Sequence, residues 1–293
     1  MDIEVLGALS VRKNGLSIAP TAPKPRQVLA LLALHSDQVV PLATLAEELW
    51  DDTPPRSART TVQTYVMQLR ELIGEALARR DGECRTAKDV LVTLPGGYRL
   101  ETDPTESTVD FREFERRATA GHRAMDAGDH TGAARLLREA LALWTGPALT
   151  GVHQGSRLRT EAERLEEARL AALDRRIEAD LRLGRHRELL SELTVLVSRY
   201  PMHEALHGQF MLALHRSGRR SEALGAYQRL RATLVAKAGL EPSAALGRLQ
   251  MAILAARPGT PVPDGSPAGQ LPTEQQLPTE QQLFTEQLAA RAS

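Results

Sequence analysis

The chain has 293 residues, of which 42% are hydrophobic, so it is long enough for two domains and too apolar to be disordered throughout. Its 37 Lys and Arg residues are balanced by 37 Asp and Glu residues, so the overall charge indicates no polyanionic partner. The single cysteine, Cys84, excludes a disulfide framework, and neither a secretory signal nor an apolar run of bilayer length is found, so we expect a soluble, cytoplasmic protein without a membrane partner.

The first hundred residues change from a strand pattern to a helix pattern and back. Alternating apolar residues over 2–20 predict short strands around a tight turn at Asn14-Gly15. Helical spacing then predicts three helices, one entered through Pro25, one opened by Pro41 and one over about residues 57–73.

After Gly82 the strand pattern returns. Val90, Val92 and Leu94 alternate, and Pro95-Gly96-Gly97 turns the chain into a last short strand. Strands, three helices and a terminal hairpin in this order predict an α+β winged helix-turn-helix domain over residues 1–104.

From Val109 onward the sequence indicates helices only. Small turns centred on Gly128, Gly184 and Gly218 recur between them, and the residues around Glu222 and Tyr227 match the small and aromatic packing positions of a tetratricopeptide unit. We therefore predict an all-α tetratricopeptide-like helical repeat domain over residues 109–256. Residues 257–293 are rich in Pro, Gly, Gln and Thr and contain a tandem Leu-Pro-Thr-Glu-Gln-Gln, so we predict a low-complexity, disordered tail.

The third predicted helix has the side chains that a DNA-reading helix needs. Opposite its apolar stripe it presents Thr and Gln flanked by Arg, and in a major groove Gln can pair with adenine and Arg with guanine or phosphate. The candidates for DNA contact on this helix and just before it are Arg56, Arg59, Thr60, Gln63, Thr64, Met67, Gln68 and Arg70. Residues 56–99 carry eight basic and five acidic residues, a local positive excess that also suits DNA. The alternative is an ordinary amphipathic helix with a solvated polar face.

The second predicted helix and the loop after it have the opposite charge. Residues 27–55 contain no Lys or Arg but several acidic residues, which suits a basic protein partner. The candidates for that contact are Glu47, Glu48, Trp50, Asp51 and Asp52. For Asp51 and Asp52 the alternative is favourable charge near the N-terminus of the third helix.

In its motifs the chain resembles the Streptomyces antibiotic regulatory proteins, in their short form with an OmpR-like winged helix-turn-helix and a bacterial transcriptional activation domain. The resemblance covers nearly everything to Leu254. The motifs that carry it are Pro23-Lys24-Pro25-Arg26, Leu49-Trp50, Val62-Gln63-Thr64-Tyr65-Val66, Leu94-Pro95-Gly96-Gly97-Tyr98, Leu143-Trp144-Thr145-Gly146-Pro147-Ala148-Leu149, Glu222-Ala223-Leu224 and Gly239-Leu240-Glu241-Pro242-Ser243.

The resemblance implies a cytoplasmic, nucleoid-associated activator of secondary-metabolite genes. It implies that the third helix reads direct repeats in double-stranded promoter DNA, with a second protomer on the neighbouring repeat. It assigns Thr93 and Arg99 to the wing, and it implies that the loop from Trp50 to Arg56 contacts RNA polymerase holoenzyme, including its sigma factor. One position departs from the pattern, since related helices often carry Arg where this chain has Gln68.

Two other interpretations compete with a DNA-binding activator. His203-Glu204-Ala205-Leu206-His207 has the spacing of a zinc-hydrolase helix, although apolar residues around it suggest a repeat helix and only a distant residue such as Glu222 could add a ligand. A protein-interaction scaffold whose winged helix does not read DNA is the second alternative. We expect no enzymatic activity, no catalytic or metal-binding residues and no cofactor.

Overall fold

The computed structural model describes residues 1–51, 53–79, 85–103 and 107–256, so Asp52, Cys84 and the predicted tail lie outside the described residues. The chain divides into two compact units, Met1–Leu183 and Gly184–Ser293. In the described ranges, no helix combines the length and apolarity needed to cross a membrane.

A four-stranded sheet opens unit 1, with the strand order β3-β2-β1-β7. Its strands are β1 (Asp2–Glu4), β2 (Ser10–Lys13), β3 (Leu16–Ser17) and β7 (Thr108–Val109). The predicted turn is present, because Asn14 and Gly15 both have positive φ, 51° and 78°, as a tight hairpin between β2 and β3 requires. The strand β7, which pairs parallel to β1, was not predicted, since two residues give no periodic signal.

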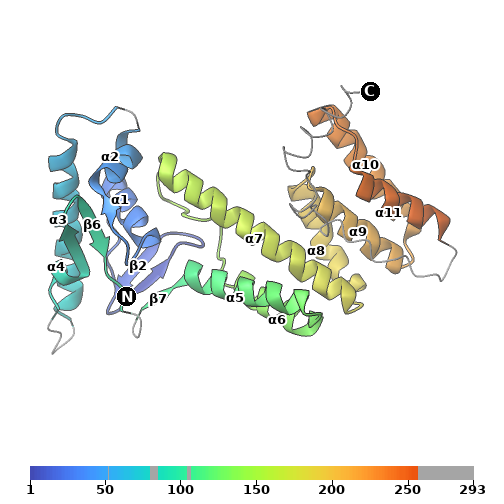
Figure 1. Ribbon diagram of the computed structural model, residues 1–293, viewed down its shortest axis with the longest axis horizontal. Helices are drawn as coiled ribbons and strands as arrows, with labels where there is room; N and C mark the ends of the chain where they lie inside the picture. The colour runs from blue at the N-terminus through green and yellow to red at the C-terminus, as the bar shows by residue number, and fades with distance from the viewer. Residues whose placement is uncertain (52, 80–84, 104–106, 257–293) are drawn as a thin grey trace, which may run out of the picture. The chain divides into compact units, whose positions relative to one another are not determined.

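The three predicted helices follow (Figure 1). A three-stranded sheet of order β4-β6-β5 accompanies them. They are α1 (Pro23–Leu34), α2 (Leu42–Trp50) and α3 (Ala58–Leu77); the strands are β4 (Val40–Pro41), β5 (Leu91–Leu94) and β6 (Gly97–Leu100). The helix α3 is longer than predicted because its buried stripe continues through Ile73, Ala76 and Leu77. Val90, predicted in a strand, instead ends a one-turn helix α4 (Ala87–Val90), which a capping box of Thr86 and Asp89 begins.

Three more helices complete unit 1 and share its hydrophobic core. They are α5 (Asp110–Asp126), α6 (His130–Leu141) and α7 (Ser156–Arg182). One continuous cluster of buried side chains runs from Ile3 in the sheet and Leu69 in α3 to Phe114 in α5 and Leu165 in α7. The boundary between the two compact units, after Leu183, lies inside the predicted domain 109–256. The domain limits 1–104 and 109–256 remain a prediction from the sequence.

The described residues of unit 2 form helices joined by short turns and loops. Its helices are α8 (His186–Arg199), α9 (Glu204–Arg216), α10 (Arg220–Ala238) and α11 (Ala244–Ala255). The predicted turns are confirmed, since Gly128, Gly184 and Gly218 all have φ between 77° and 79°, a left-handed conformation that favours glycine. This repeated helix–glycine–helix unit is the tetratricopeptide-like pattern that the sequence predicts.

The two histidines of the zinc-hydrolase motif have structural roles in unit 2. His203 caps α9, and its Nδ1 atom accepts a hydrogen bond of 3.3 Å from the Leu206 amide. His207 lies in the core of the unit with 6% of its surface exposed. Glu222, the distant third-ligand candidate, forms an ion pair of 2.6 Å with Arg219. Within the part of the chain that the structure describes, no group of three His, Cys, Asp or Glu side chains is arranged to hold a metal ion.

His207 predicts an acid-sensitive stability for unit 2. Burial, with nearby Arg229 and His203 charges, lowers the pKa of His207 from 6.5 to about 4. The folded state therefore binds fewer protons than the unfolded state between these values, and the free energy of unfolding decreases as the pH falls through this range. Between about pH 7 and about pH 5 the loss from this group is ~2 kcal/mol. The free energy of unfolding is measured by urea unfolding followed by circular dichroism. In a His207→Leu variant, its decrease over the same pH interval should be smaller by that amount. An equal decrease in the variant and the unaltered chain would contradict the prediction.

Candidate nucleic-acid interface

The helix α3 lies beside the hairpin of β5 and β6 (Figure 1). Most of the side chains that it exposes to solvent are polar. Its inward stripe, with Val62, Val66 and Leu69, is buried, and this burial fixes which side of the helix faces solvent. The predicted contact residues that are exposed are Arg56, Arg59, Thr60, Gln63, Thr64, Met67 and Gln68. The structure thus brings these predicted residues together on one accessible surface.

A groove separates this face of α3 from the hairpin. Gln63, Met67 and Arg70 line it from α3, and Thr93 and Lys88 line it from the other side. Thr93 is exposed, as a wing residue that contacts DNA must be. Lys88 was not among the predicted contacts, although its charge was part of the positive excess, because sequence alone does not place the exposed one-turn helix α4 beside the groove.

Arg70 connects α3 to the wing. Its Nε and Nη2 atoms donate hydrogen bonds of 3.0 and 2.6 Å to the Leu91 carbonyl, and Nη2 also donates to Thr93 Oγ1 at 2.7 Å. A guanidinium that binds two groups of β5 in this way holds the wing at a fixed position against α3. Arg70 was predicted only as a DNA contact, so the structure adds a positioning role.

Arg99, the other predicted wing residue, is half-buried and forms an ion pair with Glu101. Its charge is therefore partly compensated within the protein. Glu71, which also lines the groove, is a second acidic neighbour of the predicted DNA-binding surface. Of the wing candidates, Thr93 is the more accessible one.

The predicted polymerase-contact residues have different environments. Asp51 is exposed and ends α2 with a positive φ of 51°. Trp50 is half-buried, and the Lys24 ammonium lies 4.7 Å from its ring centroid in a cation–π contact. Glu47 forms an ion pair of 2.8 Å with Arg157 at the surface.

The prediction that Glu48 contacts a partner protein is wrong for a physical reason. Its side chain is 2% exposed, and its carboxylate binds the N-terminus of α7. One oxygen accepts a hydrogen bond from the Gly155 amide at 2.7 Å, and the other accepts from Arg157 and Leu158 amides at 3.0 and 2.9 Å. These are amides that a helix leaves unpaired at its first turn, and a carboxylate also favours the positive end of the helix dipole.

Two further residues fit around the Glu48 carboxylate. The Gln27 side-chain amide donates to the Glu48 carbonyl at 2.8 Å and to Oε1 at 2.7 Å. Gly155 leaves no room for a side chain, because an added Cβ would lie 2.1 Å from the Glu48 carbonyl oxygen. Helices α1, α2 and α7 thus meet at one fully hydrogen-bonded acidic group.

A second carboxylate, Asp110 at the start of α5, joins α5 to the first strand. It accepts hydrogen bonds from the Val5 and Leu6 amides at 2.7 and 2.8 Å. Burial raises the pKa of Asp110 above its ordinary value, although these amides and that of Phe111 favour its charged form.

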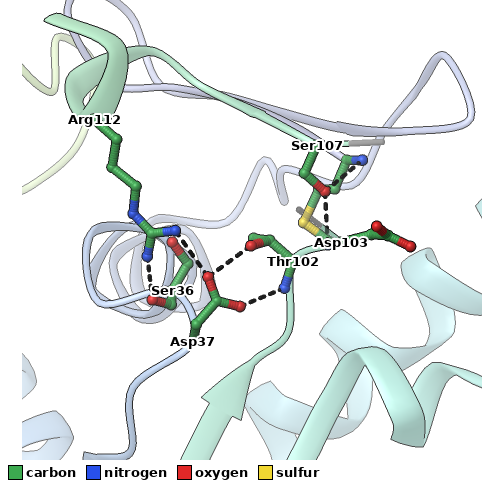
Figure 2. A network of polar contacts seen from close by, with 7 residues as sticks. Ser36, Asp37, Thr102, Asp103, Ser107 and Arg112 are labelled. Atoms are coloured by element: carbon green, nitrogen blue, oxygen red, sulfur yellow. Dashed lines mark hydrogen bonds and ion pairs between the residues drawn. The ribbon is translucent and has the colours of Figure 1, made fainter. Parts of the chain in front are cut away.

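A third carboxylate, Asp37, lies between the end of β6 and α5 (Figure 2). It accepts hydrogen bonds from the Thr102 amide and hydroxyl at 2.7 and 2.6 Å. It also forms an ion pair of 2.8 Å with Arg112. Partial burial raises the pKa of Asp37, but the bonds from Thr102 and Arg112 outweigh burial and hold it below its ordinary value. Arg112 also donates to the Ser36 carbonyl, so one arginine of α5 holds the turn after α1.

Two family models match the chain. The model for the C-terminal domain of transcriptional regulatory proteins matches residues 19–100, and the model for the bacterial transcriptional activator domain matches residues 109–254. The first match contains α3 and the wing, and the second contains α5 to α10.

Similar proteins include regulators from Streptomyces and Mycobacterium. Regulatory protein DnrI of Streptomyces peucetius is 53% identical over 88% of this chain and 94% of its own length. Transcriptional regulator RedD of Streptomyces coelicolor is 35% identical over 90% of this chain and 73% of its own length. Regulatory protein AfsR of the same species is 37% identical over 87% of this chain, which spans only 24% of AfsR.

A solved structure has the same fold. It is Mycobacterium tuberculosis EmbR in complex with a low-affinity phosphopeptide, with a TM-score of 0.77 and 33% sequence identity. The match covers 86% of this chain and 64% of the EmbR chain. The likeness supports the arrangement of a winged domain followed by helices.

Proposed function

The chain belongs to the Streptomyces antibiotic regulatory protein family of transcriptional regulators, and we propose that it activates transcription by binding direct repeats in promoter DNA and recruiting RNA polymerase. The genes that we propose as targets are those of a biosynthetic cluster for an antibiotic or another secondary metabolite. Protomers would bind adjacent repeats, with α3 of each in the major groove. The observation that carries the proposal is the exposed polar face of α3 beside a wing that Arg70 holds in place.

The chemistry of this face fits base reading. Gln63 and Gln68 are exposed and can each pair with an adenine edge, whereas Arg56 and Arg59 near the start of α3 can reach phosphates. On the other side of the groove, Thr93 and Lys88 can contact the backbone next to the base pairs that α3 reads.

Polymerase recruitment is assigned to the loop after α2. The accessible groups are Asp51 after α2 and, in the last turn of α2, the half-buried ring of Trp50 and the surface carboxylate of Glu47. Glu48 is excluded by burial, and Asp52 is a candidate from sequence alone. Unit 2 offers further surface to a protein partner, since it exposes large apolar side chains that such a partner would cover. These are Val195, Met202, Val235, Leu240, Met251 and Leu254.

A footprint of the purified protein on the DNA around its own gene tests the proposal. We expect the unaltered chain to protect evenly spaced repeats. At a protein concentration that gives full protection with the unaltered chain, a Gln63→Ala, Gln68→Ala double variant should give none. Gln228→Ala, an exposed glutamine of α10, is the matched control and should protect as the unaltered chain does.

Absence of protection on that DNA, followed by no sequence selected from a random-site pool, would refute DNA reading and favour the scaffold interpretation. Protection that survives in the double variant would keep the activator but place its base reading outside Gln63 and Gln68.

A further inference from the structure

Met67 is an apolar side chain at the centre of the polar face of α3. It is 56% exposed, and the only other large hydrophobic side chain so exposed among the described residues of unit 1 is Val39, at 45%. A single exposed hydrophobic residue is ordinary on a protein surface, so its exposure alone carries no argument. Its neighbours do, because Met67 lines the groove together with Gln63, Arg70 and Thr93.

Only one group in the major groove of DNA matches an apolar side chain. Bases present hydrogen-bond donors and acceptors there, and thymine alone adds a methyl group, at C5. The groups that surround Met67 on α3 bind donors, acceptors or phosphates, as Gln63, Thr64 and Gln68 can. A flexible, polarisable thioether among them has no polar partner on the DNA but can pack against a methyl group.

We propose that Met67 reads a thymine in each half of the binding site by packing against its C5-methyl group. The proposal rests on the proposed function, since it requires α3 to enter the major groove. Met67 lies four residues after Gln63, which is about 6 Å along the helix axis. The thymine therefore lies within about two base pairs of the adenine that Gln63 contacts, given a rise of roughly 3.4 Å per base pair.

Deoxyuridine tests this contact by removing one methyl group and no hydrogen-bonding group. Each thymine of a bound repeat is replaced in turn, and the Kd for the full chain is measured by fluorescence anisotropy. At one position per repeat we expect the Kd to rise about 3- to 5-fold, the effect of uncovering about one methyl group. Restoring bulk at that position with 5-bromodeoxyuridine should return the Kd to that of thymine.

The protein side of the contact is tested with Met67→Ala. This variant should bind the thymine site about 3-fold or more weakly and should show no further loss with deoxyuridine at the sensitive position. The matched control is Val39→Ala, an exposed apolar residue outside α3, which should keep the full deoxyuridine effect.

The other outcomes distinguish failure of the Met67–thymine contact from failure of the proposed DNA-binding function. Tight, specific binding with no sensitive thymine would refute the Met67 contact without contradicting the proposed DNA-binding function. A deoxyuridine effect that is unchanged in Met67→Ala would do the same. Absence of specific binding by the unaltered chain refutes the proposed function instead.

Discussion

Replacing Glu48 with alanine is expected to lower the free energy of unfolding of unit 1 by about 3 kcal/mol or more. The substitution removes the acceptor for three amides at the start of α7 and for the side chain of Gln27. Gly155 and Leu158 are buried, so water does not readily replace the lost bonds. Both tryptophans of the chain, Trp50 and Trp144, lie in unit 1, so urea unfolding followed by tryptophan fluorescence reports on this unit.

The neighbouring Glu47 provides the control. Its ion pair with Arg157 lies at the surface, where the two side chains are 39% and 54% exposed, and such pairs contribute roughly 0–1 kcal/mol. Glu47→Ala should therefore change the unfolding midpoint little. Glu48→Gln keeps one acceptor oxygen and the shape of the side chain, so its free energy of unfolding should lie between those of the two alanine variants. Equal losses for Glu47→Ala and Glu48→Ala would contradict the structural role of Glu48.

The Glu48 contact also lies next to the proposed polymerase-contact residues. It fixes the end of α2 to the start of α7, and the proposed polymerase loop begins two residues later at Trp50. Because Gln27 of α1 binds the same carboxylate, Glu48 joins α2 to α1 as well as to α7. The winged domain and α5 to α7 share one continuous hydrophobic core within unit 1.

Much of the fold could be predicted because its signals are local. The buried stripe of α3 repeats over 20 residues. The positive φ of Asn14, Gly15 and the repeat glycines could be predicted because Asn and Gly are the residue types that most readily adopt it. The exposed candidates on α3 follow from that stripe, since burial of one side of a helix leaves the opposite side to solvent.

The parts that could not be predicted depend on contacts distant in sequence. Glu48 binds residues more than a hundred positions away, and its own neighbourhood of acidic residues is what an exposed patch would show as well. Arg70 reaches β5 across 21 residues, so from the sequence its positive charge indicates only a DNA contact. Val90 joined a helix because the capping bonds of Thr86 and Asp89 outweigh an alternating pattern of only three residues.

Replacing Arg70 with alanine is expected to weaken binding to all DNA sites by about 10- to 100-fold without changing their order of preference. The guanidinium makes charge-assisted hydrogen bonds to the Leu91 carbonyl and to Thr93, and such bonds contribute roughly 1.5–3 kcal/mol. Without them the wing is no longer fixed against α3, and ordering it on the DNA costs free energy at every site alike. Gln68→Ala, by contrast, should change the order of preference, because we propose that this exposed glutamine pairs with a base edge.

Salt dependence separates positioning from direct contact. If Arg70 acted mainly by neutralising a phosphate, its loss would reduce the slope of log K against log salt by about one. If it acts by holding β5, the affinity falls while the slope stays the same, and Arg70→Lys, which keeps the charge but not the two-pronged geometry, falls nearly as far. A slope reduced by one in Arg70→Ala, with binding restored by lysine, would assign Arg70 to the phosphate backbone and leave the wing to be held by the β4–β6–β5 sheet alone.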